Sequence, residues 1–153
     1  MIWAVHREKG AIVWAGQYPQ EGYAVEELDD VIDTELQAFL LPSPAAVLAA
    51  KIAAGIAITS TGAAALNATY ALDDKSVGQI FQIGMWANQF GAFPEGSTQD
   101  YPDITGVNHT FTVAQFVAFM KAVAPLYASL QRQYATLAAG GSPSWPKQSA
   151  TIT

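Results

Sequence analysis

Cysteine is absent from this chain of 153 residues, and charged residues make up only 13% of it. Without cysteine the chain has no disulfides, no thiol nucleophile and no cysteine-ligated zinc. The 13 acidic residues outnumber the seven Lys and Arg, so the net charge is −6, and the basic residues form no cluster. Binding to phosphate groups depends on such clusters. We therefore expect no contact with nucleic acid.

Long apolar runs are also missing. The longest, over residues 45–58, is interrupted by Lys51 and Gly55 and is too short to span a bilayer. The first ten residues lack the basic region and apolar stretch of a signal peptide. We therefore expect a soluble protein made in the cytoplasm, with no membrane partner. The 51% of hydrophobic residues fits either an alanine-rich core or a surface covered by a partner or a second copy.

Motifs for catalysis are scarce. The chain has two histidines, His6 and His109, and no G-x-S-x-G elbow, phosphate loop or dinucleotide fingerprint. Asp103 could orient His109 as a general base, or oxygen ligands and this imidazole could hold a metal. However, Asp, Asn and Gly are also the residues that turns require. We favour a turn, and we predict a protein that is not an enzyme and uses no metal and no cofactor.

The N-terminal segment, residues 1–41, has the pattern of a β-hairpin followed by an acidic stretch. Apolar residues alternate over 2–6 and 11–15, and Gly10 suits the short loop between them. A third, short strand is expected at 23–25. The acidic run over 26–36 predicts a short helix, because carboxylates favour the positive end of a helix.

Residues 43–140 predict a compact, mainly helical domain with a short β element, so the fold class is α+β. Ser43 and Pro44 are typical of a helix start, and Asp73 or Asp74 caps a later helix. The expected elements are a helix from Pro44 to about Gly55, strands over 56–60 and 66–72, and a helix from Asp74 to about Gly91.

The longest predicted helix follows a polar loop over 92–108. Thr112 and Gln115 form a capping box, and apolar residues then recur every three or four positions as far as Leu137. Pro125 predicts a kink, because proline removes one helical hydrogen bond. Residues 141–153 are expected to form a C-terminal tail rich in Pro and Trp.

Aromatic residues gather around the polar loop, and a further Trp lies in the tail. Rings of this kind either anchor partners and sugars at a surface or fill the core at helix ends, and the sequence leaves both open. Together with the two polar residues of the loop, the candidate binding residues are Trp86, Phe93, Tyr101, Asp103, His109, Phe111 and Trp145.

Three segments carry a resemblance to a known group of proteins. They read AAKIAAGIAITSTGAAALNATYALDD, FGAFPEGSTQDYPDITGVNHTFTVAQFVAFMKAV and SWP, within about residues 45–146. In order and spacing they resemble small proteins of tailed phages and prophages, among them tail-fibre assembly proteins and phage proteins of unknown function. Asp103, Gly106, His109 and Phe111 match that pattern, which carries no catalytic residue.

The resemblance implies a setting more than a mechanism. It suggests a non-enzymatic tail-associated or tail-fibre assembly protein that acts through protein–protein contacts. Its expected partners are a phage tail or tail-fibre protein and a second copy of itself. The expected location is the host cytoplasm during assembly, or the tail of the virion. The alternative is a carbohydrate- or receptor-binding module of a phage tail.

Overall fold

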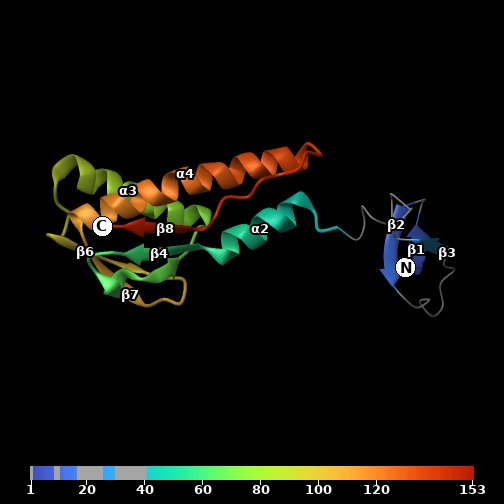
Figure 1. Ribbon diagram of the computed structural model, residues 1–153, viewed down its shortest axis with the longest axis horizontal. Helices are drawn as coiled ribbons and strands as arrows, with labels where there is room; N and C mark the ends of the chain where they lie inside the picture. Colours follow the sequence, from blue (N-terminus) through green and yellow to red (C-terminus); the bar gives the residue numbers. More distant parts are fainter. Residues whose placement is uncertain (1, 9–10, 17–25, 30–40) are drawn as a thin grey trace. The chain divides into compact units, whose positions relative to one another are not determined.

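The computed structural model describes residues 2–8, 11–16, 26–29 and 41–153, and it contains both helices and strands (Figure 1). The predicted α+β class is confirmed. Contacts along the chain define two compact units, Met1–Ser43 and Pro44–Thr153. Each unit has its own sheet and its own buried residues.

The first unit holds a three-stranded antiparallel sheet in the order β2-β1-β3. The predicted hairpin forms from β1 (Ile2–Glu8) and β2 (Ala11–Gly16). Val5 and Ile12 are buried against each other, with Ala15 packed beside them. The alternating apolar pattern of the two strands therefore produces a small core of its own.

The third strand corrects one expectation. β3 (Glu26–Asp29) pairs antiparallel with β1, so the acidic run begins as a strand and not as a helix. A helix of one or two turns is marginal in water, whereas pairing with the edge of β1 provides backbone hydrogen bonds immediately. The strand expected at 23–25 and residues 30–36 lie outside the described residues.

The second unit packs three helices against small sheets (Figure 1). One sheet has the order β5-β4-β8, and β6 and β7 form a separate two-stranded sheet. The elements are α2 (Pro44–Ala54), β4 (Ile56–Ser60), η1 (Ala64–Leu66), β5 (Ala68–Tyr70), α3 (Asp74–Phe90), β6 (Thr98–Pro102), β7 (Asn108–Thr112), α4 (Val113–Ala138) and β8 (Ser149–Ile152).

The capping box begins α4 at the predicted residue. The Thr112 hydroxyl accepts from the N–H of Gln115 at 3.4 Å, and the Gln115 side chain accepts from the N–H of Thr112 at 2.9 Å. These two bonds satisfy donors that a helix start leaves open. The helix then continues through Pro125 to Ala138.

By length and composition, α4 is apolar enough to cross a membrane. In the second unit, however, its apolar stripe faces the protein and contributes much of the core. The buried residues of this stripe are Phe116, Phe119, Val123, Leu126 and Leu130. The stripe repeats every three or four residues, as expected for a helix that covers a core on one side.

The C-terminal segment 141–153, expected as a tail, contributes a strand to the sheet. β8 pairs in parallel with β4, from Ala57 opposite Ser149 to Ser60 opposite Ile152. Just before β8, the Gln148 amide donates to the carbonyl oxygens of Lys51 and Gly55, at 2.7 Å each. These carbonyls lie at the C-terminal end of α2, where the last carbonyl oxygens of a helix have no N–H of the same helix as a hydrogen-bond partner. Gln148 therefore ties the end of the chain to α2.

The loop expected over 92–108 contains a β-hairpin. β6 and β7 pair antiparallel from Thr98 opposite Thr112 to Pro102 opposite Asn108. Each strand buries a single ring, Tyr101 or Phe111, between exposed or half-buried polar residues. The residues form strands and not a loop because these two buried rings anchor them, although the remaining residues are those of a polar loop.

Two glycines of α3 differ in what surrounds them. A Cβ added at Gly84 would lie 2.7 Å from Sδ and 2.8 Å from Cβ of Met120, so Gly84 lets α4 approach closely. A Cβ added at Gly78 would meet nothing within 4 Å. Close packing of the two helices therefore requires glycine at position 84 and not at position 78.

We predict opposite effects of alanine at these two positions. Gly84→Ala should lower the free energy of unfolding by about 1–3 kcal/mol, because the new methyl overlaps Met120. Gly78→Ala should raise it by roughly 0.5–1 kcal/mol, because glycine is the poorer residue in a helix interior. Urea denaturation measures both. In a Met120→Ala background the cost of Gly84→Ala should shrink; equal costs in the two backgrounds would contradict this packing.

Candidate functional site

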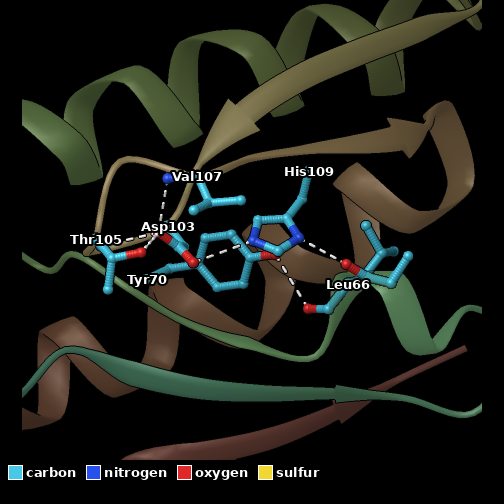
Figure 2. A network of polar contacts seen from close by, with 7 residues as sticks. Leu66, Tyr70, Asp103, Thr105, Val107 and His109 are labelled. Carbon is cyan, nitrogen blue, oxygen red and sulfur yellow. Dashed lines mark hydrogen bonds and ion pairs between the residues drawn. The ribbon is translucent and has the colours of Figure 1, made fainter.

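The turn between β6 and β7 is built around the carboxylate of Asp103. Its Oδ1 accepts from the N–H of Thr105 at 2.8 Å, the hydroxyl of Thr105 at 2.7 Å and the N–H of Val107 at 3.0 Å (Figure 2). The backbone adds a bond from the N–H of Asp103 to the carbonyl of Val107 at 2.8 Å. Gly106 completes the turn with a φ of 87°, a conformation that favours glycine.

His109 connects this turn to η1. Its Nε2 lies 3.2 Å from Oδ2 of Asp103, and its Nδ1 lies 2.6 Å from the carbonyl oxygen of Ala65 (Figure 2). Both partners are acceptor oxygens, so each ring nitrogen of His109 faces an acceptor within the protein. The side chains of His109 and Asp103 are only 13% and 12% exposed. The pair therefore acts as a partly buried clamp between two segments far apart in sequence.

Tyr70 lies beneath the clamp. Its hydroxyl donates to the carbonyl oxygen of Leu66 at 3.0 Å, and its ring meets the His109 ring edge-on at 5.7 Å between centroids. Burial, and then the negative charge of Asp103, raise the pKa of Tyr70 to about 12. A second backbone bond, from the N–H of Ile104 to the carbonyl of Thr69 at 2.8 Å, attaches the turn to β5.

This geometry gives Asp103 and His109 a positioning role. A general base needs a ring nitrogen that can reach substrate, and both nitrogens of His109 already face acceptors within the protein. Among the residues that the structure describes, no three His, Asp or Glu side chains are grouped so that they could hold a metal ion. The arrangement fits the turn that the sequence analysis favours.

The tip of the turn exposes two aliphatic side chains. Ile104 is 46% exposed and Val107 is 56% exposed, although the backbone that carries them is held by the bonds of Asp103. Sequence reasoning overlooked both, because isolated Ile and Val in a polar loop carry no signal by themselves. Two apolar side chains on a fixed turn are suited to contact with another molecule.

The sequence leaves two roles open for the candidate binding rings, core and surface, and three of them lie in the core. Phe93, Tyr101 and Phe111 are at most 5% exposed and belong to the core. Tyr101 and Phe111 both pack edge-on against Phe116 of α4, at 5.7 and 5.3 Å. Burial of large apolar area on the long helix outweighs exposure in the loop. These rings position the hairpin and are not available to a ligand.

The two tryptophans have different surroundings. Trp145 is half-buried against the core, and Nζ of Lys51 lies 5.7 Å from the centre of its ring. Trp86 is 46% exposed and contacts the ring of Phe90, itself 56% exposed, at 4.5 Å between centroids. A cavity of about 310 Å³ opens beside it, lined by Gln82, Ile83, Trp86, Pro94 and Gln99. Of the predicted rings, Trp86 is the one that borders this cavity.

Comparisons with protein-family models, with curated proteins and with solved structures found no match to this chain.

We predict that the turn loses stability in acid. Hydrogen bonds from the Thr105 hydroxyl, and then from His109 and backbone amides, hold the pKa of the Asp103 carboxyl well below its usual range. This contribution is fully present above the unfolded value of about 3.9, and it is lost progressively as the pH falls below that value toward the lowered pKa of the folded state. Urea denaturation from pH 7 to pH 3 should show a shallower acid loss for Asp103→Asn than for the unaltered protein.

The Thr105→Ala variant refines this measurement. It removes the first of the hydrogen bonds to Asp103, so its loss of stability in acid should lie between those of the unaltered protein and Asp103→Asn. If all three proteins lose stability with the same slope, the carboxylate is not held in its charged form by this turn.

Proposed function

We propose that this protein is a non-enzymatic, tail-associated or tail-fibre assembly protein of a bacteriophage, acting through protein–protein contacts at the β6–β7 turn. The observation that carries the proposal is the fixed turn that exposes Ile104 and Val107. The sequence resemblance over about residues 45–146 supports the phage setting.

The turn has the properties of a contact site formed before its partner arrives. Ordering a loop upon binding costs free energy, and a loop that is already ordered avoids this cost. Here three hydrogen bonds fix the turn. The Asp103 carboxylate accepts one from the N–H of Val107 and bonds to His109, and the Thr69 carbonyl accepts one from the N–H of Ile104. Protein interfaces commonly gain most of their binding free energy from a few residues near the centre of the contact. Ile104 and Val107 are suited to that role.

Low charge supports the same proposal. From Ile104 to Val123 the chain has one Lys, Lys121, and no Arg, Asp or Glu, so the turn and the start of α4 offer little charge to a partner. Interface centres are depleted of charged residues compared with ordinary protein surface. The partner we propose is a tail or tail-fibre protein encoded with this chain, in the host cytoplasm during assembly.

A binding experiment tests the turn as a contact site. The protein is co-expressed with each tail and tail-fibre protein of the same phage, and complexes are detected by size exclusion with light scattering. The double variant Ile104→Asp, Val107→Asp should weaken the complex about tenfold or more, as removal of central anchors does. Leu41→Asp is the matched control, because Leu41 is 68% exposed but lies outside the hairpin.

The outcomes separate the possible failures. Equal binding by the double variant and the unaltered protein would exclude the turn as the contact site. Absence of binding to every tail protein, together with absence from purified virions by mass spectrometry, would overturn the proposal as a whole. Presence in virions identifies a component of the tail, and binding without presence in virions identifies an assembly factor.

A further inference from the structure

The cavity beside α3 is mainly apolar, but two amide side chains are among the residues that line it. α3 contributes Gln82, Ile83 and Trp86, the following turn contributes Pro94, and β6 contributes Gln99. One wall is therefore an aromatic ring, and amide side chains come from two separate elements. Its volume of about 310 Å³ is at the lower end of the roughly 300–1,000 Å³ that small-molecule sites occupy.

The segment of the chain that supplies most of the cavity lining has no charged residue. No charged residue occurs from Ser76 to Pro94, and none of the five lining residues is charged. The nearest charged residues along the chain are acidic, Glu95 after Pro94 and Asp100 after Gln99. An anionic ligand would find no cation there and would be repelled by these carboxylates. The carboxylates therefore disfavour an anionic ligand, and the uncharged lining residues suit a neutral one.

Trp86 provides a flat apolar platform. Its ring is 46% exposed, and the neighbouring Phe90 ring supports it at 4.5 Å and an angle of 44°. Gly91 ends α3 immediately after this pair, with the left-handed φ of 67° typical of a helix end. Both rings therefore lie on the last turns of a helix whose C-terminus is capped, and not on a loop.

The amides provide donors and acceptors together. The side chain of Gln82 is exposed and, within residues 41–153, has no hydrogen-bond partner. Gln99 donates through Nε2 to the carbonyl of Asp100 at 2.8 Å, which leaves its side-chain oxygen as an acceptor. A purely apolar ligand would bury these amides without partners, at a cost in free energy. A ligand with hydroxyl groups would satisfy them, because a hydroxyl both donates and accepts.

We infer that this cavity is a binding site for a neutral saccharide, with a sugar ring stacked on Trp86 and its hydroxyls bonded to Gln82 and Gln99. A pyranose ring has an apolar face of C–H groups and a polar rim of hydroxyls. That combination matches an exposed indole flanked by uncharged amides. The site is separate from the β6–β7 turn and does not depend on the proposed function of that turn.

Nuclear magnetic resonance titration tests the site. The methyl glycosides of glucose, galactose and N-acetylglucosamine serve as neutral probes, and glucuronic acid and N-acetylneuraminic acid serve as acidic ones. At about 10 mM, at least one neutral probe should shift the indole N–H of Trp86 and the side-chain amide of Gln82. The acidic probes should bind more weakly.

Variants distinguish the cavity from the rest of the surface. Trp86→Ala should weaken binding by about tenfold or more, and Gln82→Ala by about fivefold, as loss of an aromatic contact and of a hydrogen bond predict. Gln79→Ala is the matched control, because Gln79 is an exposed amide on α3 that does not line the cavity. Trp86→Phe should retain part of the affinity, and it replaces Trp86→Ala if that variant does not fold.

Three results would overturn the inference: no shift with any neutral probe, tighter binding of an acidic probe, or binding that Trp86→Phe and Gln82→Ala leave unchanged. The double variant at Ile104 and Val107 should bind the saccharide normally. Loss of tail-protein binding and loss of saccharide binding are therefore separate outcomes, and either proposal can fail without the other.

Discussion

The second unit is organised by contacts between aromatic rings around Tyr70. The centroid of its ring lies 4.8 Å from that of Phe119 in α4, 5.8 Å from Phe111 in β7 and 6.4 Å from Tyr101 in β6. Tyr70 itself belongs to β5, so one buried side chain joins the sheet, the hairpin and the long helix. Its hydroxyl needs a partner once it is buried, and the Leu66 carbonyl meets that need. The Leu66 carbonyl belongs to η1, so this hydrogen bond ties η1 to Tyr70. The neighbouring Ala65 carbonyl in η1 is the one that bonds to His109.

This core also decides what remains on the surface. Because Phe93, Tyr101 and Phe111 are used for packing, the hairpin presents aliphatic side chains at its tip and polar ones along its strands. The Trp86 and Phe90 rings lie on the exposed side of α3, away from the contact at Gly84 that α4 occupies. Two surfaces of different chemistry result, an aliphatic tip and an aromatic groove edged by amides.

Local signals in the sequence predicted the elements that local interactions stabilise. The capping box at Thr112, the cap at Asp73 and the end of α3 near Gly91 all occur where the sequence indicates them, because each depends on neighbours within a few residues. The β6–β7 hairpin escaped prediction. Its strands show one aromatic residue each, and these rings are buried only once the hairpin folds back onto Phe116 of α4.

The sequence by itself determined the α+β class, the boundaries of α2, α3 and α4, and the scarcity of charge, since these follow from composition and short-range periodicity. Only the tertiary structure decided which aromatic residues are core and which are surface, because burial depends on contacts between distant segments. The same holds for the candidate sites. Asp103 and His109 are close in sequence, but the Ala65 carbonyl that completes their clamp is not. Likewise Gln82 and Gln99 face one cavity because α3 and β6 lie together in the fold.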